Sequence, residues 1–430
     1  RPRLGLPETE QLCVELHGST DLPGLRLPGE RRYMTQSDEP SESQGESSMS
    51  TDVVIVSGVR TPIATAYKGS LGGVDAFALA ELVIKEAVER SGIAPADFED
   101  MGFGESFQGG GNIGRNAAIR AGLNNLPGVA TQRWCASGMA GVQWVAANIS
   151  AGMIDAGLAG GVESMTTAPA SSKGEESFWL SPANEPTELA PPFNTALGVG
   201  DNAARLAGVS REDADLWAFT SHQNAIRAID EGRFKNEIVP VPLPGGGEFS
   251  VDEHPRRGST LEKLASLGVL NPQYDWATTT AGNASGLNDA AAALTIVSRA
   301  YAEAHGLKPL AVIRGWASVA LTPEETGLTP EPAMRKALAK AGIGVSDLQA
   351  VEINEAFASV AVAATRRLGL DEGIVNQNGS GCSLGHPIGC TGARMIVTML
   401  NELERTDSQW GAVAMCAAGG MGSATVIERV

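Results

Sequence analysis

The chain runs through one pattern of strands and helices twice, and this repetition limits the folds open to it. From residue 51, and again from about residue 307, a strand is followed by a helix, a short strand, a helix, a strand, a loop with its helix, and a final strand with glycines. Ala159-Gly-Gly161 and Ala418-Gly-Gly420 fall at comparable places in the two copies. The repeat predicts an α/β protein built from a duplicated αβ unit. Crossover rules predict mixed, mostly parallel sheets covered by helices.

Changes in composition divide the 430 residues into a leader, two halves and an insertion. Residues 1–50 are rich in Pro, Ser and Glu without sustained periodicity, which predicts a disordered leader or an added extension. Residues 51–165 together with 288–306 form the first half, and residues 307–430 form the second. Residues 166–287 change character, and we expect them to be a large inserted loop domain without a core of its own.

Two further expectations concern helices near the insertion. The alanine-rich run Asp289–His305 is interpreted as a helix that follows the insertion. His222, on a long expected helix, and His305, at a helix end, are expected at the surface.

Charge and cysteine content exclude several classes of function. The formal net charge of −18 argues against a nucleic acid or an anionic membrane as the main partner, although a small anionic ligand needs only a local basic patch. No apolar run reaches the roughly 18 residues that a membrane span requires. Five cysteines without metal-type spacing indicate reduced thiols in a cytoplasmic setting, with no metal site.

A glycine-rich stretch, Asn376–Arg394, holds His386 between Gly385 and Pro387. Glycine allows tight turns and close backbone approach, so this stretch is typical of a strand-to-helix loop at a ligand site. A histidine fixed in such a loop can take and give protons near neutral pH. A plain turn with a surface histidine is the alternative.

Two cysteines stand at the ends of expected strands. Cys135 lies between a strand-like run and an alanine-rich helix, where a helix N-terminus lowers a thiol pKa and favours the nucleophilic thiolate. Cys416 lies at the matching strand end of the second half. Glycines after such positions free backbone N–H groups that can stabilise an oxyanion. Asn354 follows another strand and could hold a water or a carbonyl, or simply cap a helix. Each cysteine could equally be a buried packing residue.

Taken together, these residues resemble the thiolase family, the acyl-CoA:acetyl-CoA C-acyltransferases, over roughly Val53 to Val430. Seven stretches match in the family's order: Ser57-Gly-Val-Arg-Thr-Pro62, Gln132-Arg-Trp-Cys-Ala-Ser-Gly138, Gly160-Gly-Val-Glu-Ser-Met165, Thr280-Ala-Gly-Asn-Ala-Ser-Gly286, Asn354-Glu-Ala-Phe357, Gly385-His-Pro-Ile-Gly389, and Cys416 with Gly419-Gly-Met-Gly422. The resemblance implies an αβαβα layered fold.

The resemblance also implies a mechanism. Cys135 attacks the 3-keto carbon of a 3-ketoacyl-CoA after His386 takes its proton, and Cys416 protonates the departing acetyl-CoA enolate. CoA then attacks the acyl-Cys135 thioester; the reverse direction is a Claisen condensation. One oxyanion site would use His386 with a water on Asn354, and the other the backbone N–H groups of Cys135 and Ala418. The activity implied is acetyl-CoA C-acyltransferase, with acetyl-CoA C-acetyltransferase, which forms acetoacetyl-CoA, as the alternative.

The family pattern further implies how coenzyme A is held. Ser285 matches a serine near the pantetheine, and Arg256 a basic residue near the nucleotide end, with Arg257 one position away. The insertion would cover CoA. CoA is a substrate, no cofactor is bound permanently, and a homodimer or homotetramer acting in fatty acid metabolism such as β-oxidation is expected. The sequence leaves open the acyl chain length and the direction of the reaction.

The chain departs from the family pattern in a few places. Ala418 stands where a glycine is usual, and a required positive φ there would weaken the second oxyanion site. Cys382 and Cys390 are interpreted as small packing residues. A ketosynthase acting on acyl carrier protein is an alternative on the same fold, but Cys416 and the shortage of histidines favour a thiolase. A non-catalytic acyl-CoA or lipid carrier is a further alternative, and Ala418 is the only feature in its favour.

Overall fold

One mixed sheet runs through the part of the chain that this computed structural model describes, residues 52–169 and 195–430. The expected leader and residues 170–194 of the insertion lie outside the described residues. The sheet has ten strands in the order β10-β11-β12-β9-β1-β8-β5-β3-β4, with β2 beside β8. Its strands are β1 (Val53–Arg60), β2 (Ala64–Thr65), β3 (Asp100–Gly104), β4 (Val129–Thr131), β5 (Ala156–Ser164), β8 (Asn288–Ser298), β9 (Ala311–Ala320), β10 (Ala350–Ile353), β11 (Trp410–Ala417) and β12 (Met421–Arg429). A separate hairpin joins β6 (Val241–Pro242) to β7 (Glu248–Phe249).

Helices cover both faces of this sheet and also separate its two parts. They are α1 (Ala76–Ser91), α2 (Ile113–Arg120), α3 (Ser137–Ser150), α4 (Thr195–Ala207), α5 (Arg211–Asp230), α6 (Leu261–Ala265), α7 (Arg299–Ala304), α8 (Pro330–Ala341), α9 (Ala358–Leu368) and α10 (Thr391–Thr406). Short 3₁₀ helices lie at Pro95–Asp97, Pro323–Leu328, Val345–Asp347 and Glu372–Ile374.

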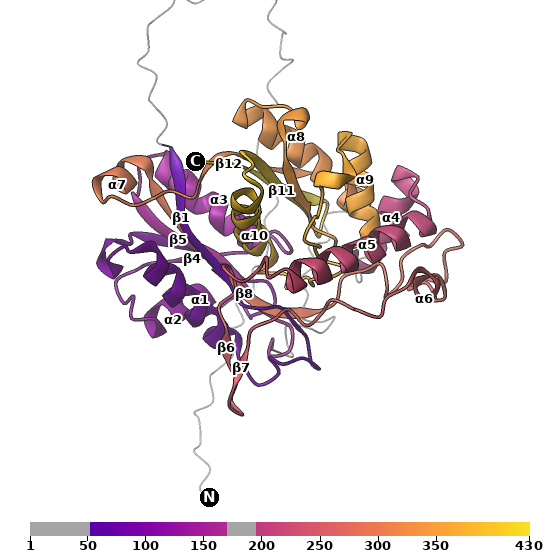
Figure 1. Cartoon of the computed structure of the whole chain (residues 1–430), viewed down its shortest axis with the longest axis horizontal. Helices are drawn as coiled ribbons and strands as arrows, with labels where there is room; N and C mark the ends of the chain where they lie inside the picture. The colour runs from indigo at the N-terminus through magenta and orange to yellow at the C-terminus, as the bar shows by residue number, and fades with distance from the viewer. Residues whose placement is uncertain (1–51, 170–194) are drawn as a thin grey trace, which may run out of the picture. The chain divides into compact units, whose positions relative to one another are not determined.

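The layers follow the order αβαβα that the resemblance implies. Figure 1 shows α3 and α10 in the centre, with α1 and α2 to one side and α8 and α9 to the other. The central core joins Met139 of α3 and Met395 of α10 to Leu294 of β8 and Val413 of β11. Separate clusters of buried apolar side chains lie under α1 and α2 and under α8 and α9. The two halves therefore share the middle layer of helices.

The directions of the strands depart in part from the sequence-based expectation. Parallel pairs lie at the two ends of the sheet, β3 with β4 and β5, and β10 with β11. The central pairs, from β5–β8 to β11–β12, are antiparallel. The sheet is thus mixed, as expected, but less parallel than the crossover rule suggests, because that rule applies only to strands joined through a helix. A tight turn joins β11 to β12 instead, with Gly419 at φ 82° and Gly420 at φ 79°.

The expected helix Asp289–His305 is wrong over most of its length. Asn288–Ser298 is strand β8, buried along its whole length between β1 and β5, and only Arg299–Ala304 is helical. Alanine is the strongest helix former, but helix propensity is a small preference that tertiary packing overrides. Strand β5 packs so closely against β8 that it needs glycine at position 160, since a Cβ on Gly160 would lie 2.3 Å from the Ala292 carbonyl oxygen.

Two smaller expectations also fail. Ala159, Gly160 and Gly161 lie inside β5 rather than at its end, because β5 continues to Ser164. His222 is buried on α5, not exposed, since that helix packs against the second half. The described part of the insertion has no core of its own: Ala203 of α4 and Ala218 of α5 share a cluster with Val360 of α9 and with Cys416.

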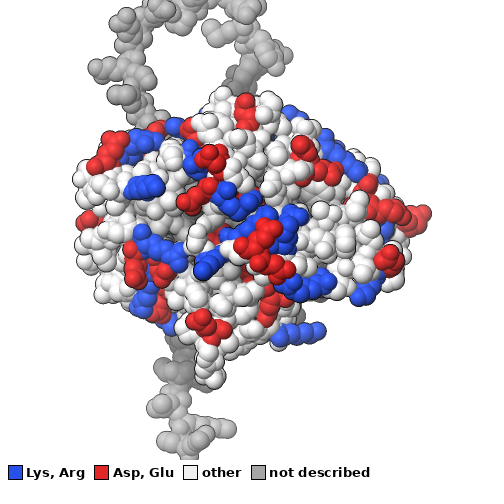
Figure 2. All heavy atoms as spheres, in the orientation of Figure 1, with Lys and Arg blue, Asp and Glu red and all other residues white. Residues whose placement is uncertain are grey.

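Charged side chains are spread over the surface without a large region of one sign on the face that Figure 2 shows. No helix in residues 52–169 or 195–430 is long and apolar enough to cross a membrane.

A buried ion cluster fastens the insertion to the first half. The guanidinium of Arg60, at the end of β1, donates two hydrogen bonds to Asp252 at 2.8 and 2.9 Å and one to Glu237 at 2.5 Å. All three side chains are buried. Burial opposes the charge, yet Asp252 and Glu237 raise the pKa of Arg60 above its usual value. Arg60 therefore remains charged inside the protein, whereas burial raises the pKa of Glu237.

We expect Asp252→Ala to lower the free energy of unfolding by about 3–5 kcal/mol, because it leaves the Arg60 charge buried with one partner fewer. Urea unfolding of the purified chain measures this. The matched control is Asp230→Ala, which breaks an exposed arginine–aspartate pair with Arg257. It should leave the urea midpoint nearly unchanged. Equal shifts for the two variants would contradict a structural role for the buried cluster.

Candidate active site

Cys135 lies in the short loop between β4 and α3 and is half-buried. The chain turns sharply just before it, since Trp134 has a φ of 48°. Two backbone N–H groups, those of Ala418 and of Cys135 itself, face the Cys135 sulfur and act to lower the pKa of its thiol. Backbone donors from both halves of the chain thus converge on one sulfur atom, an arrangement that can stabilise negative charge there.

Cys416 is buried at the end of β11, where the sheet of the second half faces the same loop. Burial raises the pKa of the Cys416 thiol, and so does its interaction with Cys135. Such an interaction requires the two sulfurs to be near each other. The structure therefore brings together two cysteines that are far apart in the sequence.

His386 is buried in the glycine-rich loop that leads into α10. Its backbone N–H donates to Asn288 Oδ1 at 2.9 Å, and its Nδ1 lies 2.7 Å from Thr391 Oγ1 and 3.4 Å from Asn354 Nδ2. Burial, together with the positive charge of Arg394, lowers the pKa of His386 to about 3. The imidazole is therefore neutral at physiological pH and can act as a base.

Two polar atoms in this site are buried without a hydrogen-bond partner in the described part of the chain, His386 Nε2 and Asn354 Oδ1. A buried polar atom without a partner costs free energy, so proteins rarely keep one unless it has a task. Both atoms belong to side chains that meet at His386 Nδ1. Their position fits a site that receives a polar group of a substrate or a water.

Gly389 connects the His386 loop to the first half. Its N–H donates to Glu163 Oε2 at 2.9 Å. Its carbonyl oxygen lies where a side chain on three other glycines would be: a Cβ on Gly104, Gly138 or Gly161 would come within 2.5, 2.9 and 2.2 Å of it. Gly138 is three residues from Cys135, so this contact holds the His386 loop beside the Cys135 loop.

Glu163 is a residue that sequence reasoning quoted in a motif but gave no role. Besides Gly389 it accepts hydrogen bonds from the Phe107 N–H and from Gln108 Nε2. Burial raises the pKa of Glu163 to about 7. Asn288, Thr391 and Arg394 were missed in the same way. Asn288 and Thr391 contact His386, and Arg394 pairs with Glu352 beneath it.

The side chains expected to bind CoA take part in none of the contacts described above. The Ser285 N–H donates to the Ala356 carbonyl at 2.9 Å, two residues beyond Asn354. Arg256 is exposed, and its backbone N–H donates to His222 Nδ1 at 3.2 Å. Arg257 pairs with Asp230. These side chains stay predictions for CoA binding.

Alanine fits at position 418 without strain. The residues with positive φ in this turn are Gly419 and Gly420, and Ala418 is not among the non-glycine residues of the described chain with positive φ. The departure from the family pattern therefore leaves the Ala418 N–H free to face Cys135. Cys382 and Cys390 are buried, as expected of packing residues.

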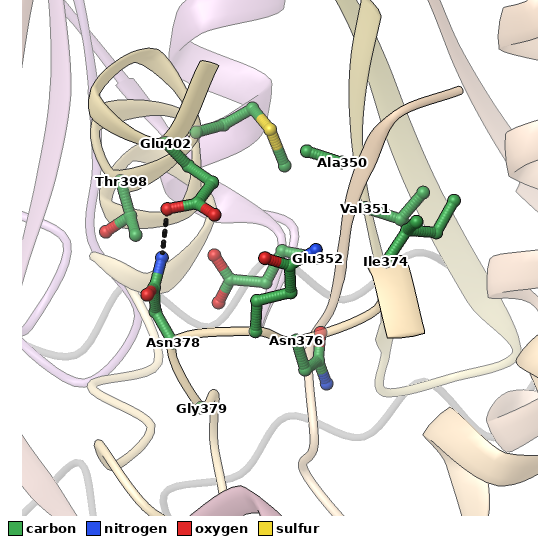
Figure 3. A pocket seen from close by; sticks show the side chains of 11 residues that line it. Ala350, Val351, Glu352, Ile374, Asn376, Asn378, Gly379, Thr398 and Glu402 are labelled. Carbon is green, nitrogen blue, oxygen red and sulfur yellow. Dashed lines mark hydrogen bonds between the residues drawn. The ribbon is translucent and has the colours of Figure 1, made fainter. Parts of the chain in front are cut away.

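A small cavity of about 20 Å³ lies between β10, the segment 374–379 and the second half of α10 (Figure 3). Its lining includes Glu352, Asn378 and Glu402, and Asn378 Nδ2 donates to Glu402 at 2.8 Å. The volume has room for about one water. None of the residues predicted to be catalytic lines it, so it is not the candidate active site.

Comparisons with known proteins indicate one family from residue 53 to residue 429. The family model described as "Thiolase, N-terminal domain" matches residues 53–300, and "Thiolase, C-terminal domain" matches residues 307–429. The chain is 38% identical to the 3-ketoacyl-CoA thiolase of Bacillus subtilis over 88% of its own length and 99% of that protein. It is 40% identical to the β-ketothiolase BktB of Cupriavidus necator, over 89% and 100%. The crystal structure of the acetyl-CoA acetyltransferase of Bacillus anthracis superimposes with a TM-score of 0.80 at 37% identity, over 88% and 99%.

The pKa values of Cys135 and His386 contradict one expectation from the sequence. A helix N-terminus was expected to lower the pKa of Cys135, but Cys135 precedes the first residue of α3, and burial raises its pKa to about 11 despite the backbone donors. At pH 7 both the Cys135 thiol and the His386 imidazole are therefore neutral. The rate of Cys135 alkylation by iodoacetamide should rise about tenfold per pH unit up to about pH 11, because the thiolate reacts.

Mass spectrometry of alkylated peptides over a pH series measures this rate, with Cys135→Ala as the blank. An alkylation rate that levels off near neutral pH would mean that a thiolate–imidazolium pair exists in the resting site, against this prediction.

Proposed function

Since this chain belongs to the thiolase family, we propose that it cleaves 3-ketoacyl-CoA with CoA to acetyl-CoA and a shortened acyl-CoA, through an acyl thioester on Cys135. The reverse Claisen condensation uses the same groups. The observation that carries the proposal is that both halves meet at one sulfur: the N–H of Ala418 faces the Cys135 sulfur, and the Cys416 thiol interacts with it.

In the first step His386 Nε2 takes the Cys135 proton, and the sulfur attacks the 3-keto carbon. Both groups start neutral, so the buried site does not hold an ion pair before substrate arrives. The negative charge that develops on the substrate oxygen is stabilised by backbone N–H groups fixed in advance. We assign the N–H groups of Cys135 and Ala418 to this role.

In the second step the C–C bond breaks and acetyl-CoA leaves as an enolate, which Cys416 protonates. Its thiol suits this role because burial and Cys135 raise its pKa, so it holds a proton at neutral pH. Before CoA attacks, the proton on His386 passes to the Cys416 thiolate, so that both groups return to their starting state. CoA then attacks the acyl-Cys135 thioester while His386 takes the proton of the CoA thiol and returns it to the departing Cys135 sulfur. His386 and a water on Asn354 serve as the second oxyanion site, and the two unpartnered buried atoms support this assignment.

The names of the relatives suggest two classes of substrate. Relatives are named 3-ketoacyl-CoA thiolase, β-ketothiolase and acetyl-CoA acetyltransferase. We favour acetyl-CoA C-acyltransferase activity in fatty acid β-oxidation. Formation of acetoacetyl-CoA from acetyl-CoA is the second candidate, because several relatives carry that enzyme's name. Ser285 and Arg256 are assigned to CoA, which would pass beneath the insertion.

We further propose that the enzyme works as a homodimer or homotetramer in the cytoplasm, without a permanently bound cofactor. The short strand β4 ends the sheet, and the half-buried residues Arg133, Trp144 and Trp316 lie around a hollow next to it. An open sheet edge beside partly exposed aromatic groups suits contact with a second copy. Four free cysteines in the described chain, two of them needed as thiols, suit a reducing compartment.

Thiolysis of a graded series of 3-ketoacyl-CoAs by the purified chain tests the function and resolves the substrate. We expect CoA-dependent loss of the 3-ketoacyl-CoA enolate absorbance and release of acetyl-CoA. Turnover of acetoacetyl-CoA alone would favour the second candidate. With Cys135→Ala, the acyl adduct seen by mass spectrometry in the native chain should vanish and turnover should fall by at least about 10³-fold. An adduct on another residue would contradict the assignment of the nucleophile.

Cys416→Ser should separate the two half-reactions. The variant keeps Cys135 and His386, so transfer of an acyl group from acyl-CoA to Cys135 should continue, although more slowly. Cleavage and condensation should fall by at least about 10²-fold, because the serine hydroxyl is a much weaker acid than the thiol. Single-turnover acylation and steady-state thiolysis measure the two. An equal loss in both would contradict the role of Cys416.

A further inference from the structure

Thr391, the first residue of α10, has a fully buried side chain with two short polar contacts. Its Oγ1 lies 2.7 Å from His386 Nδ1 and 2.8 Å from the Pro387 carbonyl oxygen. Both distances are those of hydrogen bonds, and each hydrogen bond requires a proton between its two atoms. A threonine hydroxyl has only one proton to give, although it can accept further hydrogen bonds.

The Pro387 carbonyl determines where that proton goes. A carbonyl oxygen only accepts, so the 2.8 Å contact between two oxygens requires the Thr391 hydroxyl to donate to it. The 2.7 Å contact to Nδ1 must then receive its proton from the ring. In a neutral imidazole, one nitrogen carries the proton and the other a lone pair. His386 is therefore protonated on Nδ1, and Nε2 carries the lone pair. The NH₂ group of Asn354 also lies 3.4 Å from Nδ1, but in this tautomer both groups are donors, so that longer contact is not a hydrogen bond.

We propose that Thr391 is a positioning residue that fixes the Nδ1–H tautomer of His386 and so keeps Nε2 available as the proton acceptor of the active site. This inference rests on the proposed function, in which Nε2 takes the proton of Cys135. Nε2 is buried without a partner in the described residues, as a base awaiting its substrate would be.

The surroundings hold both members of this pair in place. The Thr391 N–H also donates to the Pro387 carbonyl at 2.9 Å, which fixes the hydroxyl relative to the loop. The His386 backbone N–H donates to Asn288 Oδ1, which holds the backbone that carries the ring. When Nε2 takes a proton, the Nδ1–H bond to Thr391 remains, so the hydroxyl also stabilises the cationic ring that forms.

The opposite network is possible in principle and has an opposite consequence. If the Thr391 hydroxyl donated to Nδ1, its oxygen and the Pro387 carbonyl oxygen would lie 2.8 Å apart with no proton between them. The ring would then carry its proton on Nε2 and could not take one from Cys135. The tautomer therefore decides between the two networks.

Nitrogen-15 NMR of histidine-labelled protein measures the tautomer without any assay of activity. The chain has five histidines, and a His386→Gln spectrum identifies the signals of His386. In the native chain we expect a protonated Nδ1 and an unprotonated Nε2 at pH 7. A protonated Nε2 would overturn the proposal, whether or not the chain has thiolase activity. Inactivity with the expected tautomer would instead sink the proposed function alone.

Variants at position 391 test whether the hydroxyl is the cause. Thr391→Val keeps the shape and removes the acceptor, so part of the Nδ1 proton should move to Nε2. The kcat for thiolysis should fall about tenfold, with the KM for CoA unchanged. Thr391→Ser should restore the tautomer and bring kcat within about threefold of the native value. A native tautomer in Thr391→Val, or a serine variant as impaired as the valine variant, would refute the role of the hydroxyl.

The matched control is Thr398→Val, two turns further along α10. Thr398 is also buried, but its hydroxyl donates to Glu237 and does not contact His386. This variant should keep the native tautomer and kcat within about twofold. A loss equal to that of Thr391→Val would mean that any lost hydroxyl on this helix impairs the site, and would overturn the proposal.

Discussion

The contact on which the rest of the site depends is the docking of the Gly389 carbonyl against Gly104, Gly138 and Gly161. A Cβ on any of these three would lie within 2.9 Å of that oxygen, far closer than packed atoms approach, so only glycine permits the contact. Gly389 belongs to the loop of His386, and Gly138 to the start of the helix that follows Cys135. The distance between base and nucleophile is thus set by backbone packing between the two halves. Glu163 strengthens this contact between the two halves by accepting a hydrogen bond from the Gly389 N–H.

Burial then determines the charge state of the groups that meet there. It raises the pKa values of both thiols and lowers that of His386, so the resting site holds few charges apart from the pair of Arg394 and Glu352 beneath the loop. A neutral site avoids the desolvation cost of a permanent thiolate–imidazolium pair. In the proposed mechanism, charge appears only when substrate fills the site, where the N–H groups at Cys135 receive it. The same burial that suppresses ionisation at rest strengthens those hydrogen bonds during reaction.

Sequence reasoning succeeded where chemistry and spacing carry the signal, and failed where packing decides. The duplicated α/β pattern, the layered fold and the family follow from motifs that are specific in combination, as the family models bear out. Strand β8 was missed because its alanines have no periodicity to reveal a strand buried on both faces, and the central antiparallel pairs because no sequence rule orders them. Glu163 and Thr391 escaped notice because their partners are backbone groups and a ring far away in the sequence, and Arg60 because its carboxylates lie in the insertion.

The duplication explains why one half supplies the nucleophile and the other the base. Ser137 begins α3 and Thr391 begins α10, and each hydroxyl donates to a carbonyl just before its helix, that of Trp134 and that of Pro387. The two loops are therefore built alike up to the residue that does chemistry. In the first half the loop presents Cys135; in the second the equivalent turn is occupied by Gly389, and the reactive side chain, His386, lies three residues earlier. Gly389 thus replaces a reactive side chain at this turn, and its close contact with Gly138 brings the loop of the imidazole to the loop of the cysteine.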